Sequence, residues 1–311
     1  MERRKIGDLD VSLVGLGCNN FGMRIDAEQT KAVVNAAIDA GINYFDTAES
    51  YGGGKSEEFL GAAVQGRRDQ VLIATKWGMT AADDGPRPGS REAIRTAVEG
   101  SLRRLGTDYI DHYQLHRPDP GTPIGDTLSA LAELLEAGTV RAIGCSNFSA
   151  GQLDEAAEVA AELGIAPFAS VQNRYSVLTR DPETDGVLDA CARNRVAFVP
   201  FFPLESGVLT GKYRANEPPP AGSRIAAWSD RGADRFYNDE RLRQVGALTA
   251  WAESHGHSVL DLAMSWLASN PLVATVICGA TRPDQVRANA EAASWQMTDS
   301  ERAEAVALLS V

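Results

Sequence analysis

The sequence predicts an α/β fold, a single (β/α)8 TIM barrel with an N-terminal β-hairpin and extra helices. Strand-like and helix-like segments alternate along nearly the whole chain, and each intervening helix forces the strands to run parallel. Eight such units can close into a barrel. The length of 311 residues suits one barrel of this kind, and no linker divides the chain. Residues 1–311 are therefore expected to form one domain.

Apolar runs and helical periodicity place the elements in order. A hairpin with Gly7 and Asp8 at its turn is expected over residues 3–13. The barrel strands are expected at 12–17, 42–46, 71–76, 109–116, 140–146, 168–173, 196–202 and 273–279. The helices are expected at 26–41, 56–65, 90–104, 125–138, 149–164, 182–193 and 282–294. Asp26 is the expected N-cap of the first helix, and Ser56 is expected to open the second.

Two stretches depart from the regular alternation. Residues 212–238 form a long segment rich in Pro and Gly, which predicts a lid that is mobile without a ligand and ordered with it. Two helical segments precede the last strand, where the other units have one. A short helix is expected at 299–309.

Composition limits the class of protein. The net charge of -12 repels phosphate backbones, so a nucleic-acid partner is not expected. No apolar run reaches the ~18 residues of a membrane span, and no secretory leader is visible, so a cytoplasmic protein without a membrane partner is expected. Cysteines lie far apart and no His or Cys pair has ligand spacing, which predicts reduced thiols and no metal site; the cysteines are Cys18, Cys145, Cys191 and Cys278.

Four polar side chains, Asp46, Tyr51, Lys76 and His116, follow three strand-like runs. Residues just past the C-terminal ends of parallel barrel strands share one mouth, so the four can converge. A buried Lys76 needs an anion, and Asp46 is the expected partner. Lys76 should then lower the pKa of Tyr51 from ~10, and His116 should donate a hydrogen bond to a carbonyl oxygen. Each residue alone fits a bland structural role; the set predicts general-acid chemistry on a carbonyl.

Two phosphate-binding motifs can be rejected. Residues 54–56 resemble the end of a P-loop, but Glu49 stands where that motif needs its first Gly. Residues 15–17 begin like a dinucleotide fingerprint, but Asn20 occupies the third Gly position. A dinucleotide, if bound, must be held by a different device.

On these residues the chain resembles the aldo-keto reductase family. The family elements DxxxxYG, TK and LH match Asp46, Tyr51–Gly52, Thr75–Lys76 and Leu115–His116. The segments GLG, GCSN, VQN, PLESGVLTGKY and GATRPDQVRAN follow in family order at 15–17, 144–147, 171–173, 203–213 and 279–289. The resemblance covers nearly the whole chain.

The resemblance implies an NADP(H) cofactor that lies extended across the barrel mouth. Ser146, Asn147 and Gln172 would hold the carboxamide, Phe201 would stack on the nicotinamide, and Arg282 would suit a 2′-phosphate. The full set of implied cofactor contacts is Gly17, Asn20, Asp46, Ser146, Asn147, Gln172, Phe201, Phe202, Pro203, Leu204, Ser206, Lys212, Arg224, Gly279, Thr281, Arg282, Gln285 and Asn289.

Two positions differ from the usual family pattern. Phe202 stands where the family has a small residue, which places the backbone geometry of that loop in question. Ala288 stands where the family often has Glu, so one adenine contact should be missing.

The implied activity is reduction of an aldehyde or ketone to the alcohol, with the hydride from the nicotinamide and the proton from Tyr51. Trp77, with Tyr51 and His116, is expected to contact the substrate. The loops at 19–24 and 79–89 are further candidates for the pocket wall. An open pocket for a small-molecule carbonyl substrate, including bulky or sugar-type carbonyls, is expected.

Two other functions stay open. The chain also resembles the β subunits of voltage-gated potassium channels, which implies an NADP(H)-binding regulatory partner with little turnover. Against this, His116 is present where those subunits depart from the tetrad, and the chain starts close to the hairpin, so no long N-terminal arm is expected. A lyase or isomerase could use Lys76 and Asp46 without a nicotinamide. Oligomeric state and physiological substrate are not predicted.

Overall fold

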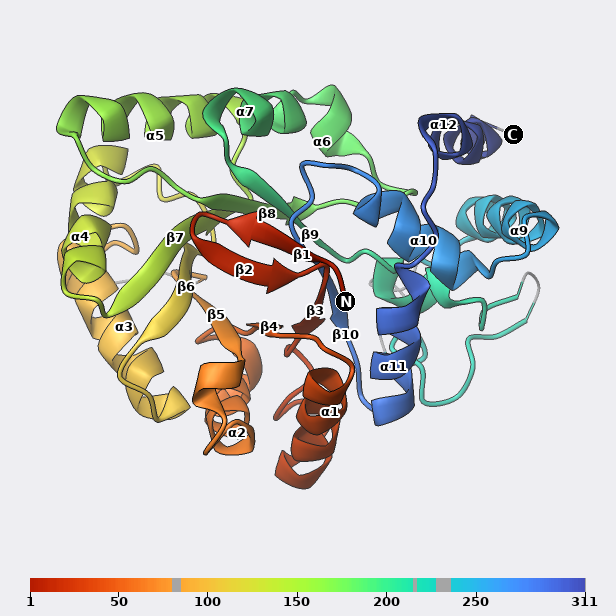
Figure 1. Ribbon diagram of the computed structural model, residues 1–311, viewed down its shortest axis with the longest axis horizontal. Coiled ribbons are helices and arrows are strands. Elements are labelled where there is room, and N and C mark those ends of the chain that lie inside the picture. Colours follow the sequence, from red (N-terminus) through yellow and green to blue (C-terminus); the bar gives the residue numbers. More distant parts are fainter. Residues whose placement is uncertain (80–84, 215–216, 228–235, 311) are drawn as a thin grey trace.

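The computed structural model describes residues 1–79, 85–214, 217–227 and 236–310, and its centre is a parallel barrel (Figure 1). The barrel strands are β3 (Val14–Gly17), β4 (Tyr44–Asp46), β5 (Leu72–Trp77), β6 (Ile110–Leu115), β7 (Val140–Ser146), β8 (Ser170–Arg174), β9 (Ala197–Phe201) and β10 (Val276–Gly279). They pair in the order β10-β3-β4-β5-β6-β7-β8-β9, and every pair is parallel. The predicted fold class is confirmed.

Between β9 and β10 the ring is joined by an isolated bridge, whereas the other neighbouring strands in the described sheet pair along a ladder. The amide of Phe198 donates to Leu272 O at 2.8 Å, and the amide of Ala274 donates to Phe198 O at 2.9 Å. Phe198 and Val273 form an isolated parallel bridge at the same point. These contacts nearly close the barrel.

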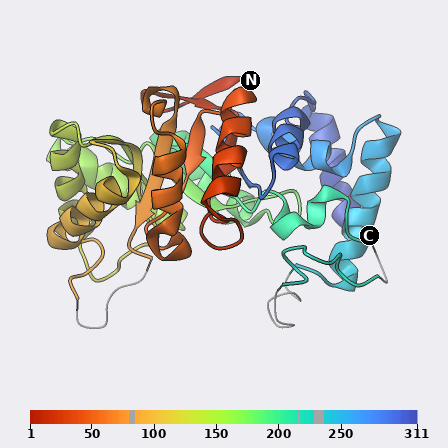
Figure 2. The same ribbon diagram turned by 90° about the horizontal axis from the view of Figure 1, so that it is seen from below.

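The predicted hairpin covers the end of the barrel at which the strands begin. It consists of two antiparallel strands, β1 (Arg3–Ile6) and β2 (Leu9–Ser12). Ile6 packs in one apolar cluster with Tyr44, and Arg4 donates to Val273 O at 2.6 Å. Figure 2 shows the hairpin and the segment 217–227 at opposite ends of the molecule. The mouth of the barrel is therefore left open to the long loops.

Helices surround the barrel, and apolar side chains fill the layer between helices and strands. The helices are α1 (Ala27–Asp39), α2 (Lys55–Ala63), α3 (Arg91–Leu105), α4 (Ile124–Glu136), α5 (Ala150–Leu163), α6 (Asp181–Thr184), α7 (Val187–Asn194), α9 (Asp239–Ser254), α10 (Val259–Ala268), α11 (Pro283–Ala292) and α12 (Asp299–Ala307). The N-cap prediction is confirmed, because Asp26 Oδ1 accepts from Gln29 N at 2.9 Å. Within the described residues, no helix is both long and apolar enough to cross a membrane.

Two helix predictions are wrong. The helix expected at 182–193 is broken into α6 and α7, because Gly186 adopts a left-handed φ of 80° and a new helix starts after it. Ser56 does not open the second helix. Gly54, with a φ of 92°, precedes that helix, while Ser56 is buried inside it and donates to Cys18 O at 2.8 Å.

Candidate active site

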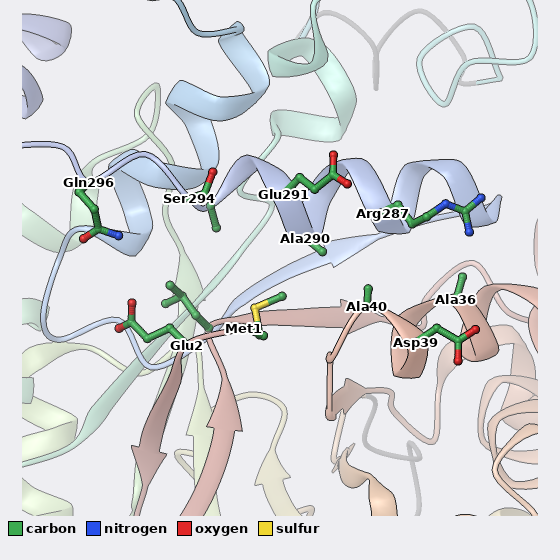
Figure 3. Close-up of a pocket in the computed structure, with 12 residues that line it drawn as sticks. Met1, Glu2, Ala36, Asp39, Ala40, Arg287, Ala290, Glu291, Ser294 and Gln296 are labelled. Atoms are coloured by element: carbon green, nitrogen blue, oxygen red, sulfur yellow. The ribbon is translucent and has the colours of Figure 1, made fainter.

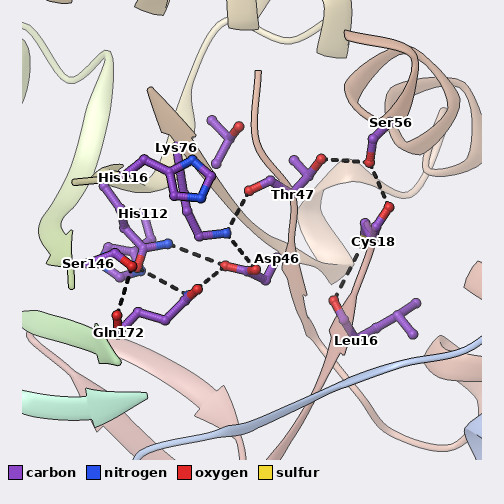
Figure 4. Close-up of polar contacts among 12 residues, drawn as sticks. Leu16, Cys18, Asp46, Thr47, Ser56, Lys76, His112, His116, Ser146 and Gln172 are labelled. Carbon is purple, nitrogen blue, oxygen red and sulfur yellow. Dashed lines mark hydrogen bonds and ion pairs between the residues drawn. The ribbon is translucent and has the colours of Figure 1, made fainter. Parts of the chain in front are cut away.

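The carboxyl ends of neighbouring strands bring the predicted catalytic residues together, and Figure 4 shows three of them, Asp46, Lys76 and His116. Asp46 ends β4, Lys76 lies in β5 and His116 follows β6 directly. Tyr51 opens the short 3-10 helix η1 (Tyr51–Gly54), which follows β4. Its ring centroid lies 5.1 Å from Lys76 Nζ and 5.9 Å from the centroid of the His116 ring. The expected convergence of these four side chains is present, and their catalytic roles stay a prediction.

Asp46 and Lys76 form a buried ion pair beneath the mouth. Lys76 Nζ lies 2.6 Å from Asp46 Oδ2 and donates to Thr47 O at 2.9 Å. The other carboxylate oxygen, Oδ1, accepts from Gln172 Nε2 at 2.9 Å and from Gln114 Nε2 at 3.4 Å. Burial opposes the charged ammonium, but Asp46 and Tyr51 outweigh burial, so the pKa of Lys76 is raised. Lys76 therefore stays cationic although its side chain has 0% exposure.

The pKa of Tyr51 is raised, whereas the sequence predicted that it would be lowered. Burial of the phenol is the largest effect and raises its pKa, whereas Lys76 lowers it and Asp46 raises it again. The net pKa lies above the ordinary value of 10.0. The expectation that Lys76 gives Tyr51 a lowered pKa is therefore wrong, because loss of water outweighs the ammonium. Tyr51 keeps its proton at neutral pH and can donate it.

His116 is a neutral group at the same mouth. Burial, with smaller contributions from the cations Lys76 and Arg117, lowers the pKa of His116 to about 3. Its backbone amide donates to Trp77 O at 2.8 Å, which fixes its position after β6. Its Nδ1 atom is buried and has no hydrogen-bond partner among the described residues. An imidazole in this state can make a hydrogen bond to a bound molecule.

The residues expected at the carboxamide form a connected network next to Asp46. Ser146 Oγ donates to Gln172 O at 2.7 Å, and Asn147 Nδ2 contacts both Ser146 Oγ and His116 O at 3.0 Å. Gln172 Nε2 has Asp46 and the more distant Gln114 as acceptors. The side-chain N–H donors of Asn147 and Gln172 thus have protein partners. The side-chain oxygens of both residues can therefore accept hydrogen bonds from a bound amide.

The turn after β9 has a strained backbone. Phe202, Glu205 and Ser206 have φ values of 56°, 45° and 59°, a region that costs a non-glycine residue about 1–3 kcal/mol. Glu205 is buried, and its carboxylate accepts from Ser176 Oγ at 2.6 Å and from Arg174 Nη2 at 2.5 Å. These contacts hold the turn. The ring of Phe202 packs edge-on against Phe201 and Phe236, with 5.4 and 5.8 Å between ring centroids, in spite of the strained backbone. The buried Ser206 Oγ lacks a partner among the described residues.

One cavity of about 690 Å³ lies at this mouth. Tyr51 and His116 line it. So do all the residues that the sequence assigns to cofactor binding, namely Gly17, Asn20, Asp46, Ser146, Asn147, Gln172, Phe201, Phe202, Pro203, Leu204, Ser206, Lys212, Arg224, Gly279, Thr281, Arg282, Gln285 and Asn289. The sequence assignments thus fall together in space, although cofactor binding itself stays a prediction.

Trp77 is not in the wall of this cavity, so its prediction as a substrate contact is wrong. Its side chain is 1% exposed and stacks on Tyr113, with 4.3 Å between ring centroids. Its Nε1 donates to Pro88 O at 2.9 Å. Neighbouring residues of a strand point to opposite faces, so Trp77 faces the helix layer because Lys76 faces the mouth. Met79 lines the cavity instead, whereas residues 80–84 of that candidate loop lie outside the described residues.

Four cationic side chains gather at one part of the cavity: Arg24, Lys212, Arg224 and Arg282. Burial, then the neighbouring cations Arg24, Arg224 and Arg282, lower the pKa of Lys212. Burial and Arg24 likewise lower the pKa of Arg224. Such mutual repulsion is relieved by an anion. Sequence reasoning missed Arg24 in this role, because it assigned the loop at 19–24 to the substrate.

Arg24 and Arg224 connect the loops that flank this cation cluster. Arg224 Nη2 donates to Asn20 Oδ1 at 2.8 Å, and Arg24 Nη2 donates to Gly222 O at 2.9 Å. The segment 217–227 is thereby tied to the loop after β3. The predicted lid spans 212–238, and its residues 215–216 and 228–235 lie outside the described part of the chain.

A second hollow of about 540 Å³ lies away from the tetrad, between α1, α11 and the chain start (Figure 3). Its wall includes Met1, Asp39, Arg287 and Glu291. None of the tetrad residues reaches it. Among the described residues, no cluster of three or more His, Cys, Asp or Glu side chains could hold a metal ion.

Comparison with known proteins identifies the family. The profile of the Aldo/keto reductase family matches residues 13–309. The chain belongs to this family. This aldo-keto reductase is also similar to three kinds of relative, which are between 32% and 37% identical to it over the aligned residues.

A protein of Oryza sativa subsp. japonica named probable voltage-gated potassium channel subunit beta is 37% identical, over 88% of this chain and 84% of that protein. Aldo-keto reductase YhdN of Bacillus subtilis is 34% identical, over 97% of this chain and 92% of that protein. L-glyceraldehyde 3-phosphate reductase of Escherichia coli K12 is 32% identical, over 88% of this chain and 81% of that protein. The family resemblance seen in the sequence is confirmed, and the chain is an oxidoreductase.

Proposed function

We propose that this aldo-keto reductase reduces an aldehyde or ketone to the alcohol and uses NADPH to do so. The observation that carries the proposal is the meeting of protonated Tyr51, the Asp46–Lys76 pair and neutral His116 at one cavity. A general acid beside a cation that stabilises its conjugate base suits the protonation of a carbonyl oxygen. The reductase names of several relatives support the same reaction class.

The residues in the cavity fit an NADP(H) cofactor. The cation cluster offers charge-assisted contacts to phosphates, and the buried hydroxyl of Ser206 lacks a protein partner among the described residues. Ser146, Asn147 and Gln172 would hold the carboxamide. When bound, the reduced nicotinamide would supply the hydride. Tyr51 and His116 line the same cavity of about 690 Å³, so the carbonyl substrate would bind on their side of it.

Each residue of the tetrad has a distinct part in the proposed reaction. Tyr51 holds a proton at neutral pH and delivers it to the substrate oxygen. Lys76 lies close to the ring of Tyr51 and stabilises the phenolate that remains after proton transfer. Asp46 keeps Lys76 charged and in place, and His116 orients the substrate oxygen through a hydrogen bond. The protein thus contributes placement and a polarised site.

A panel of aldehydes and ketones with NADPH and NADH tests this function. We expect loss of absorbance at 340 nm with NADPH and at least one class of carbonyl, at neutral pH. Oxidation of alcohols with NADP⁺ should also occur, because the same groups act in reverse. Absence of turnover across aromatic, aliphatic and sugar-type carbonyls would contradict the proposal.

A second candidate function is an NADP(H)-binding partner protein with little turnover. The observation in its favour is the 37% and 35% identity to proteins named as potassium channel β subunits. Tight binding of NADPH, seen as a change in its fluorescence, together with no consumption by any carbonyl, would favour this second function. A bound cofactor that absorbs at 340 nm would exclude a lyase or isomerase that lacks nicotinamide.

Selectivity for NADPH should depend on Arg282. This residue is the N-cap of α11, is exposed, and pairs with Asp284 at 2.9 Å. We expect Arg282→Ala to weaken NADPH binding about tenfold while NADH binding changes little, because only NADPH carries a 2′-phosphate. Fluorescence titration with both cofactors measures the ratio. The matched control is Asp284→Ala, which frees Arg282 and should not weaken NADPH binding; an unchanged ratio in Arg282→Ala would refute the assignment.

Lys212 and Arg224 should hold the cofactor and slow its release. The double variant Lys212→Gln with Arg224→Gln is expected to raise the Kd for NADPH about ten- to hundredfold, because two cations leave the cluster. Stopped-flow fluorescence should show faster NADPH dissociation. The melting temperature without cofactor should change little or rise, since the repulsion in the cluster is relieved. Wild-type dissociation in this variant would contradict a role of the segment in retaining cofactor.

A further inference from the structure

The charges that line the cavity differ in sign from the chain as a whole. The chain carries a net charge of -12, yet the cationic residues lining the cavity are Arg24, Arg117, Lys212, Arg224 and Arg282. Among the described lining residues the acid is Asp46, and its charge is matched by Lys76 at 2.6 Å. A cavity of this kind concentrates anions inside an acidic protein. The cofactor phosphates explain part of this pattern.

The cations fall into two electrostatic groups. Lys212 interacts with Arg24, Arg224 and Arg282, which are the residues of the cation cluster. A 2′-phosphate carries about two negative charges at neutral pH, and the pyrophosphate adds more, so the cofactor can balance this cluster. Arg117 does not belong to the cation cluster. Its charge instead acts on His116, whose pKa it helps to lower.

Arg117 is placed on the side of the reacting groups. It follows His116 directly at the carboxyl end of β6 and lines the same cavity as Tyr51. Within the described ranges it has no ion-pair or hydrogen-bond partner, unlike Arg282, which has Asp284. Arg117 is also an exposed residue, so its side chain can move toward a molecule that enters the mouth.

We propose that Arg117 is a specificity-determining residue that binds a carboxylate or phosphate carried by the carbonyl substrate. This inference rests on the proposed carbonyl reduction and names the substrate class: small aldehydes or ketones with an anionic group. The planar guanidinium can bind such a group through two parallel N–H donors, whereas an ammonium gives no fixed geometry. The anion would be held while His116 orients the carbonyl.

Matched substrates separate this effect from catalysis in general. With NADPH saturating, kcat/KM is measured for 4-carboxybenzaldehyde and for 4-nitrobenzaldehyde, a neutral compound of the same shape. A second pair, glycolaldehyde phosphate and glycolaldehyde, distinguishes a phosphate from a carboxylate. For each variant, kcat/KM for the anionic substrate is divided by kcat/KM for the neutral one. A change in folding or in the chemical step affects both values alike, so it cancels when this ratio is compared between variants. We expect the ratio to favour the anionic partner in at least one pair.

The variant Arg117→Ala should lower that ratio about ten- to hundredfold. Arg117→Lys should retain part of it, because it keeps the charge without the planar fork. The control is Arg103→Ala, which removes an exposed arginine on the outer helix α3 and should leave the ratio as in the wild type. Raising NaCl to 0.5 M should reduce the ratio more in the wild type than in Arg117→Ala.

The two proposals fail in different ways. If the neutral aldehydes are reduced as well as the anionic ones, or if Arg117→Ala leaves the ratio unchanged, Arg117 is a solvated surface arginine and this inference is overturned. Carbonyl reduction would still stand in that case. If no aldehyde of either pair or of the wider panel is reduced, the proposed function itself fails.

Discussion

Replacing Tyr51 by Phe should lower kcat for carbonyl reduction by about 10²–10⁴-fold, the usual contribution of general acid catalysis. The variant removes one hydroxyl and keeps the ring that lies 5.9 Å from His116 and 5.1 Å from Lys76 Nζ. NADPH binding should stay close to that of the wild type. Because burial raises the pKa of Tyr51, wild-type reduction should not fall as pH rises from 7 to 9 through loss of this proton.

The matched control is Tyr113→Phe. Tyr113 is buried in the neighbouring strand β6, and its hydroxyl has no hydrogen-bond partner among the described residues. Removing that hydroxyl should leave kcat nearly unchanged. Steady-state kinetics on the best aldehyde, with a fluorescence titration of NADPH for each variant, measure both quantities. Full turnover by Tyr51→Phe would remove Tyr51 from the mechanism and leave the proton donor to be found elsewhere.

Replacing Lys76 by Met should affect both activity and stability. The change leaves Asp46 buried without its cation, and breaking such a pair typically destabilises a protein by about 3–5 kcal/mol. Activity should also fall steeply, because the phenolate of Tyr51 would form without a nearby ammonium. Urea denaturation measures the free energy of unfolding, and aldehyde reduction measures kcat.

A double variant separates the two effects. Lys76→Met combined with Asp46→Asn removes both charges, so it should regain part of the lost stability while remaining inactive. A single variant as stable as the wild type would mean that the amides of Gln114 and Gln172 suffice to hold the Asp46 carboxylate. A single variant with wild-type kcat would falsify the role of Lys76.

The barrel and the tetrad could be predicted because both depend on periodicity. Apolar runs separated by helical segments specify parallel strands, and a polar residue just past such a run must lie at the mouth. The same reasoning could have placed Trp77 correctly. Residues alternate between faces along β5, so an inward Lys76 puts Trp77 among the helices, where it meets Tyr113.

Other features depend on packing that the sequence does not display. The pKa of Tyr51 is set mainly by loss of water, which follows from how the η1 turn folds over Lys76. The position of Arg24 depends on a loop that meets the distant segment around Gly222. The break at Gly186 could not be placed because a glycine inside a helical pattern is often tolerated. The local sequence pattern therefore predicted which residues meet at the cavity better than it predicted their pKa shifts.

The way in which the barrel closes has a consequence for how the cavity can widen. Between β9 and β10 the ring is held by the bonds of Phe198 with Leu272 and Ala274, whereas ladders join the strands elsewhere in the described sheet. The cavity straddles this joint, with residues 201–204 on one side and 279–282 on the other. Because an isolated bridge rather than a ladder joins the strands here, we expect the ring to part more easily at this joint than along a ladder. We therefore expect a bulky ligand to widen the cavity at the joint while the Asp46–Lys76 pair, whose strands β4 and β5 are joined by a ladder, keeps its geometry.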